Sequence, residues 1–221
     1  MFEHGGNKMK KGFTLTELLL ALTIVGVLAV LTVPILMNNI QNKLFATQIK
    51  NFSAEIEQLA QDQLIVHKTR DLMDTDFGEP SKLLTGGHFS ISKICPANKA
   101  KIDCWKLTAT GKDKVTYKFI NGQIKTSFRE AMTVVLKNGL MLRYDFGESG
   151  FPCLYVDVNG NDKPNIVGRD LFVFSLDSKG HIPNGSTTYS DNINKCKKTN
   201  NSSTAIYCYY ALVDNNWKMD Y

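Results

Sequence analysis

The chain of 221 residues carries 26 basic and 21 acidic side chains, a formal net charge of +5. This modest excess gives no electrostatic footprint for nucleic acid, so no nucleic acid is expected among the partners. No P-loop, G-x-S-x-G, H-E-x-x-H or dinucleotide fingerprint occurs, and the sequence therefore favours a protein that is not an enzyme.

The first predicted element is a membrane helix. Residues 18–37 contain no charged side chain, and at about 1.5 Å per residue such a helix crosses the roughly 30 Å of hydrocarbon in a bilayer. Lys8, Lys10 and Lys11 precede this run, so the positive-inside rule keeps the N-terminus cytoplasmic and sends the rest outward. The run is too long for a secretory signal peptide, and no A-x-A-like cleavage site follows it.

A single acid, Glu17, lies near the start of this segment. Placing an ionisable side chain inside a membrane segment costs free energy, so such a residue is by default a candidate functional residue. A plain uncleaved anchor would explain the hydropathy but would leave Glu17 without a reason. Pro34 removes one helix hydrogen bond, so a kink or a locally melted turn is expected there.

Residues 11–17, KGFTLTE, resemble the prepilin processing site shared by type IV pilins and the pseudopilins of type II secretion systems. The resemblance implies that a prepilin peptidase cuts between Gly12 and Phe13 and then methylates the new N-terminus at Phe13. It also implies that Glu17, Phe13 and Pro34 serve assembly. A carboxylate in low dielectric needs an opposite charge, and the Phe13 amine of a neighbouring subunit could supply it.

The same resemblance implies a division of the chain into four parts. Residues 1–12 are the prepilin leader, with Met9 as an alternative start, and residues 13–37 are the transmembrane and assembly helix. An extracytoplasmic amphipathic helix follows over 38–69, and a globular head occupies 70–221. Apolar residues recur in the amphipathic helix at spacings of three and four, at Phe45, Ile49, Phe52, Ile56 and Leu59, followed by Gln63 or Leu64.

The head is predicted to be α+β, with the long N-terminal helix packed on an antiparallel β-sheet, as in pilins. Residues 70–104 lack a sustained period and are expected to connect through short helical pieces. Two Asn-Gly turns predict hairpins; further strands and a C-terminal helix follow. The predicted strands are 114–120, 123–128, 131–137, 140–146, 153–158 and 171–176, and the helix lies within 204–213.

The five cysteines all follow the membrane segment, where an oxidising envelope compartment permits disulfides. We expect Cys95 to pair with Cys104 and Cys196 with Cys208, each closing a short loop. Connectivity is not fixed by sequence alone, so these remain expectations. Cys153 would then be buried and free.

The loop that starts at Asp157 places oxygen side chains at alternate positions, as calcium sites do. If calcium binds, the expected ligands are Asp157, Asn159, Asn161 and Asp170; no other cofactor is expected. The loop departs from an EF-hand, since its twelfth position is Gly168 instead of a glutamate. The alternative is a hairpin connection that uses Asn-Gly for its backbone angles.

The sequence as a whole predicts a structural subunit of a pilus or pseudopilus, anchored in the bacterial inner membrane and later part of a periplasmic or cell-surface filament. We favour a type II secretion pseudopilin, because some pseudopilins bind calcium in their heads. The alternatives are a type IV pilin for adhesion, motility or DNA uptake, and a membrane-anchored binding module that never polymerises. Expected partners are the prepilin peptidase, other subunits, an inner-membrane assembly platform and membrane lipid.

Overall fold

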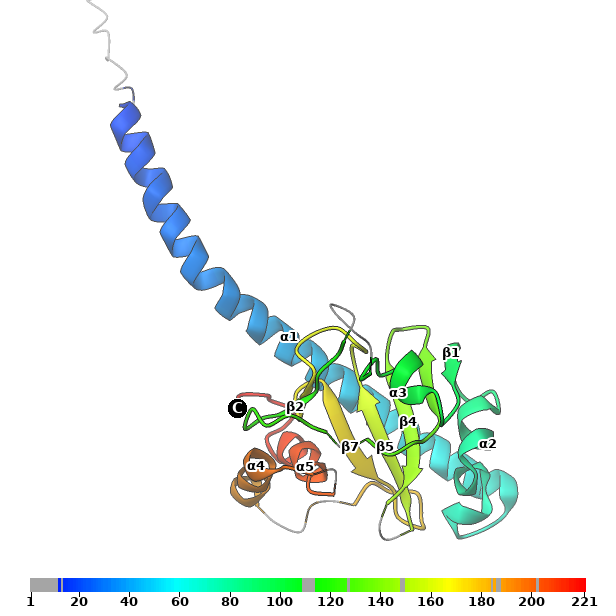
Figure 1. Ribbon diagram of the computed structural model, residues 1–221. Helices are drawn as coiled ribbons and strands as arrows, with labels where there is room; N and C mark the ends of the chain where they lie inside the picture. The colour runs from blue at the N-terminus through cyan, green and yellow to red at the C-terminus, as the bar shows by residue number, and fades with distance from the viewer. Residues whose placement is uncertain are drawn as a thin grey trace, which may run out of the picture. The chain divides into compact units, whose positions relative to one another are not determined.

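The computed structural model describes residues 12, 14–108, 114–126, 128–147, 150–183, 185, 188–201 and 203–221. It divides into two compact units, one ending at Gln41 and the other beginning at Asn42. The helix α1 (Leu15–His67) runs through both units, and a seven-stranded mixed sheet follows it (Figure 1). The predicted α+β fold with a long N-terminal helix is confirmed.

Helix α1 passes through Pro34 without interruption, so of the two predicted outcomes, a kink or a locally melted turn, the melted turn does not occur. Beyond Gln41 the helix buries one stripe of residues, as the spacing of three and four predicts. The buried residues of this stripe are Phe45, Ala46, Ile49, Phe52, Ser53, Ile56, Ala60 and Gln63. Leu59 and Leu64 are partly buried and pack against the same core.

The sheet has the strand order β1-β3-β4-β5-β7-β6-β2. Its strands are β1 (Ile91–Cys95), β2 (Lys118–Phe119), β3 (Thr133–Leu136), β4 (Met141–Phe146), β5 (Pro152–Asp157), β6 (Ile166–Val167) and β7 (Leu171–Ser175). The pairs from β1 to β7 in this order are antiparallel, whereas β6 pairs in parallel with both β7 and β2. The sheet is therefore mixed, which corrects the purely antiparallel prediction.

Two other strand predictions differ from the structure. Strand β1 forms where short helical pieces were expected, because its pairing with β3 supplies the hydrogen bonds that a weak local pattern does not indicate. The hairpin predicted around Asn121-Gly122 is reduced to β2 and one antiparallel bridge between Lys118 and Ile124. The hairpin at Asn138-Gly139 forms as predicted, between β3 and β4.

The two faces of the sheet pack against different parts of the head, since side chains alternate along a strand. Leu154 and Val156 of β5 point to the core that includes the outer half of α1. Tyr155, between them, belongs to a second core with Trp105 and Tyr117. The second core lies on the face away from α1 and contains a tight aromatic group, in which the rings of Trp105 and Tyr117 are 5.5 Å apart.

Short helices complete the head: η1 (Leu72–Asp74), η2 (Asp76–Gly78), α2 (Pro80–Thr85), α3 (Ala100–Asp103), α4 (Tyr189–Lys198) and α5 (Ile206–Asp214). Figure 1 shows α4 and α5 packed together beside β7. Helix α4 was not predicted. Thr188 caps its N-terminus by accepting a hydrogen bond from the Asp191 amide.

Two disulfides hold the head, and they are the two pairings expected from the sequence. Cys95 at the end of β1 joins Cys104 at the end of α3, and Cys196 of α4 joins Cys208 of α5. Cys153 of β5 is a free thiol, half-buried instead of fully buried. Each disulfide fastens an element with little apolar surface of its own to the rest of the head.

Candidate functional site

The N-terminal site is built around the first turn of α1. Gly12 is described and Phe13 lies outside the described residues, so the cut between them is not tested. The Oε2 atom of Glu17 accepts hydrogen bonds from the Thr14 amide at 2.8 Å and from the Thr14 hydroxyl at 2.7 Å. The Glu17 amide donates in return to the Thr14 hydroxyl at 3.3 Å.

This reciprocal arrangement is a capping box, in which a Thr at the N-cap and a Glu three residues later satisfy each other's backbone N–H groups. Thr14 is thus a functional residue that the sequence analysis missed, although the T-x-x-E spacing of residues 14–17 signals it. Both bonds from Thr14 reach Oε2 of Glu17, so neither of them uses Oε1.

The segment that follows exposes its apolar side chains. Leu18 is 53% exposed and Leu31 63% exposed. By length and composition, α1 is a helix that could cross a membrane, and its most apolar window is not buried within the molecule. Such a surface is stable only in an apolar phase, which lipid or neighbouring helices can supply.

Comparison with protein families shows that residues 7–33 match the prokaryotic N-terminal methylation motif. The chain carries the signature of type IV pilins and pseudopilins. The motif implies processing by a prepilin peptidase and assembly with other pilin subunits, and it supports a structural subunit. Comparisons with curated proteins and with solved structures found no match.

The predicted calcium loop of this pilin-type head lies between β5 and β7. Asp157 and Asp170 are both fully buried. The Tyr117 hydroxyl donates to Asp157 Oδ2 at 2.6 Å, and Asp170 accepts from the amides of Asn165 and Ile166, both at 2.6 Å. Burial, and secondly the charge of Asp170, raise the pKa of Asp157 well above its usual range. Burial raises the pKa of Asp170 to about 6.

Two asparagine side chains of the same loop are oriented by hydrogen bonds from their amide nitrogens. Asn159 Nδ2 donates to the carbonyls of Asp162 and Lys163, both at 3.0 Å, and Asn161 Nδ2 donates to the Cys104 carbonyl at 2.7 Å. Because these bonds fix each amide nitrogen, the Oδ1 atom of the same amide points away from the carbonyl that the nitrogen contacts. Among the described residues, no partner reaches the buried Oδ1 atoms of Asn159, Asn161 and Asn165.

The loop therefore contains two buried carboxylates and three orphaned amide oxygens, which is oxygen chemistry that suits calcium. Within the described parts of the chain, no group of three or more His, Cys, Asp or Glu side chains could hold a metal ion. Asn165 was not among the predicted ligands. The position where an EF-hand has its glutamate is Gly168, and the backbone there requires glycine. Its φ is +91°, and a Cβ atom added to it would lie 2.9 Å from the Cys208 sulfur.

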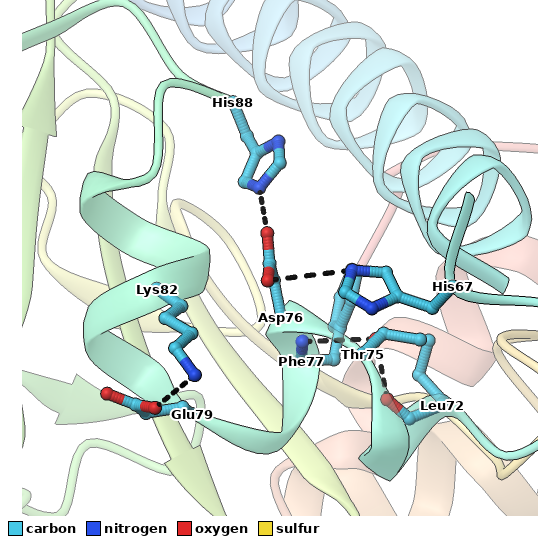
Figure 2. A network of polar contacts seen from close by, with 8 residues as sticks. All are labelled: His67, Leu72, Thr75, Asp76, Phe77, Glu79, Lys82 and His88. Carbon is cyan, nitrogen blue, oxygen red and sulfur yellow. Dashed lines mark hydrogen bonds and ion pairs between the residues drawn. The ribbon is translucent and has the colours of Figure 1, made fainter.

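A second polar cluster joins the C-terminal end of α1 to the connecting region. Asp76 lies between two histidines: His88 Nε2 is 2.8 Å from Oδ2 and His67 Nε2 is 3.7 Å from Oδ1. Figure 2 shows both rings turned toward the one carboxylate. Asp76 begins η2, where the Thr75 hydroxyl accepts from the Phe77 amide. The cluster anchors the turn after α1.

Proposed function

We propose that this protein is cleaved between Gly12 and Phe13, methylated at Phe13 by a prepilin peptidase, and polymerised through the N-terminal half of α1. Before assembly it is held in the inner membrane with its head outside. The observation that carries this proposal is the coincidence of the methylation motif with an exposed apolar helix. Such a helix needs lipid before assembly and other helices after it.

In the proposed filament, Glu17 sets the register between subunits. Its Oε2 atom already stabilises the helix end through Thr14. The Oε1 atom can then accept from the methylated amine of Phe13 in a neighbouring subunit, and this charge-assisted bond gains strength where helices exclude water. Because the amine exists only after cleavage, processing and assembly are coupled. Membrane lipid and an inner-membrane assembly platform are the further partners.

Mass spectrometry of the mature N-terminus tests this proposal. The expected product begins at Phe13 and carries one methyl group. A chain isolated from the membrane that still begins at Met1 or Met9 would contradict it and would favour the membrane-anchored binding module that never polymerises.

We further propose that the filament is a type II secretion pseudopilus. The specific support is the calcium-type loop, with Asp157, Asn159, Asn161, Asn165 and Asp170 as ligands. Deleting the gene in its host tests the type of filament: we expect folded exoproteins to accumulate in the periplasm. Loss of surface filaments, motility or DNA uptake with secretion unchanged would instead identify a type IV pilin.

Thermal unfolding of the full chain in detergent tests the calcium site. We expect calcium to raise the melting temperature and a chelator to reverse the change, because the ion binds the folded loop alone. Asp170→Asn should abolish the shift. Asp162→Asn, which removes the same charge from an exposed position in the same loop, should retain it. A melting temperature indifferent to calcium and chelator would refute the site.

A further inference from the structure

A small groove lies between the outer half of α1 and the turn that joins β3 to β4. Its volume is about 160 Å³, which is below the range of small-molecule sites but leaves room for the end of one long side chain. The buried side chains of Leu140 and Val158 line it together with the polar side chains of Gln48 and Glu55. None of the features assigned above uses this groove.

The groove offers hydrogen-bond acceptors. The Oε1 atom of Gln48 is buried and has no partner among the described residues. Glu55 is exposed, and none of the ion pairs within the described parts of the chain involves it. The described lining residues include no cation. Because a buried acceptor without a partner and an unpaired carboxylate both gain from a charged N–H donor, the groove favours the ammonium group of a lysine.

The outer half of α1 has two flanks, one on each side of the stripe that packs on the head. Gln48 and Glu55 are seven residues apart, which is close to two helical turns, so they share one flank. Lys43 and Lys50 have the same spacing and share the other flank. Each lysine precedes its acceptor by five residues, which places the two flanks about 140° apart around the helix. We call them the acceptor flank and the lysine flank.

The lysine flank presents two positive charges. Both lysines are exposed, and neither takes part in an ion pair within the described residues. The Nζ atom of Lys50 lies 5.9 Å from the centre of the Trp217 ring, a contact that brings no counter-charge. Seven residues further the same flank carries Glu57, which is half-buried and whose Oε1 accepts from the Ile182 amide at 2.7 Å. Glu57 is thus held by its own head.

In the proposed filament the two flanks come to the same level. The pairing of Glu17 with the Phe13 amine of a neighbouring subunit shifts the neighbouring helix by four residues, or about 6 Å along its axis. Helix α1 is continuous and the copies in a symmetric filament share one conformation, so parallel helices keep this shift. Lys50 of one copy then lies one residue, about 1.5 Å, from the level of Glu55 in the next. The other lysine and acceptor are offset by the same amount.

We propose that the lysine flank of one copy packs against the acceptor flank of a second copy of this chain. Lys50 then pairs with Glu55, and Lys43 donates to Gln48 Oε1 at the groove. The inference rests on the proposed function, because polymerisation through α1 sets the shift. A contact between two different surfaces is heterologous, so it repeats from copy to copy along a filament instead of closing a dimer. Beyond Glu55 the acceptor flank carries Asp62, which meets no lysine, so the contact ends there.

Charge reversal in the full chain, expressed in the host that assembles the filament, tests the contact. Lys50→Glu and Glu55→Lys should each lower the fraction of the protein in purified filaments at least about tenfold, because like charges then meet. The double variant restores opposite charges and should return to within about threefold of the unmodified chain. Lys99→Glu, at an exposed position on the face of the head away from α1, is the control and should assemble normally.

Single variants that enter filaments as the unmodified chain does would overturn the contact, and so would a double variant no better than the singles. The melting temperature of the head in detergent should be unchanged in all of them, since both positions are exposed.

Carbodiimide coupling on filaments of the unmodified chain gives a test that needs no variant. The reagent takes up one water as it joins the Lys50 amine to the Glu55 carboxyl in an amide bond, and peptide mass spectrometry identifies the product. Within one helix these side chains point about 140° apart, so the product reports two copies. The N-terminus is sequenced on the same sample. Filaments cleaved at Phe13 that lack this product would overturn the contact and leave the proposed function standing, whereas an uncleaved chain absent from filaments would overturn both.

Discussion

Both halves of α1 carry large apolar side chains but place them in opposite environments. Before Gln41 the apolar side chains are exposed, as at Leu18 and Leu31, whereas beyond it Ile49 and Ile56 have no exposed surface. The outer half finds its apolar partner within the same chain, in the core of the head. The inner half must find it in lipid or in other subunits, and that need is what makes the segment functional.

The largest expected effect is on assembly. Glu17→Ala should still insert in the membrane, because it makes the segment more apolar, but should fail to enter filaments. Quantifying the protein in purified filaments and in membranes measures both. Thr23→Ala, which also removes a polar side chain from the inner half, is the matched control and should assemble. Normal incorporation of Glu17→Ala would refute the pairing of Glu17 with Phe13.

The next effect concerns the stability of the head. Ile56→Ala should lower the free energy of unfolding by about 2–5 kcal/mol, because it leaves a cavity in the core. Leu31→Ala, at an exposed position of the same helix, should leave the head's melting temperature unchanged in detergent. Equal losses for the two variants would break the distinction between the halves of α1.

Removing the disulfide between α4 and α5 is expected to lower the stability of the head somewhat less than Ile56→Ala does. Replacing Cys196 and Cys208 together by serine should cost about 2–4 kcal/mol of head stability, because the link between α4 and α5 no longer restricts the unfolded chain. Denaturant unfolding measures the loss. Cys153→Ser, at the free thiol, is the control with an expected change well below that, and a double variant as stable as this control would contradict the prediction.

The smallest expected effect is a pH dependence of the head. The pKa of Asp170 is about 6 against an ordinary value of 3.8, so the folded state holds this proton more tightly than the unfolded state. Without calcium, stability from this group is present below about pH 4 and falls as the pH rises to about 6. Melting temperatures across this range should show the fall. Asp157, whose pKa is also raised, adds a fall of the same sign, so Asp170→Asn should reduce the fall without abolishing it. An unaltered profile in that variant would contradict the assignment.

The head shows which signals a sequence carries and which it lacks. The strands β3, β4, β5 and β7 follow clear apolar runs and Asn-Gly turns, and they were predicted. Strand β1 was missed because only Cys95 among its residues is buried. Helix α4 was missed because few of its residues are apolar; its place depends on the Thr188 cap and on the disulfide to α5.

The sequence by itself determined the membrane segment, the processing motif, the place of Glu17 and the α+β class, because each depends on residues adjacent along the chain. The capping box at Thr14 and Glu17 was also readable there. Only the tertiary structure brought Tyr117 to Asp157, left the Asn165 oxygen with no partner among the described residues, and placed Lys125 in one cavity with Cys153 of β5 and Ser175 of β7. These contacts join residues far apart in sequence, and strand order and register, which local patterns do not encode, decide them.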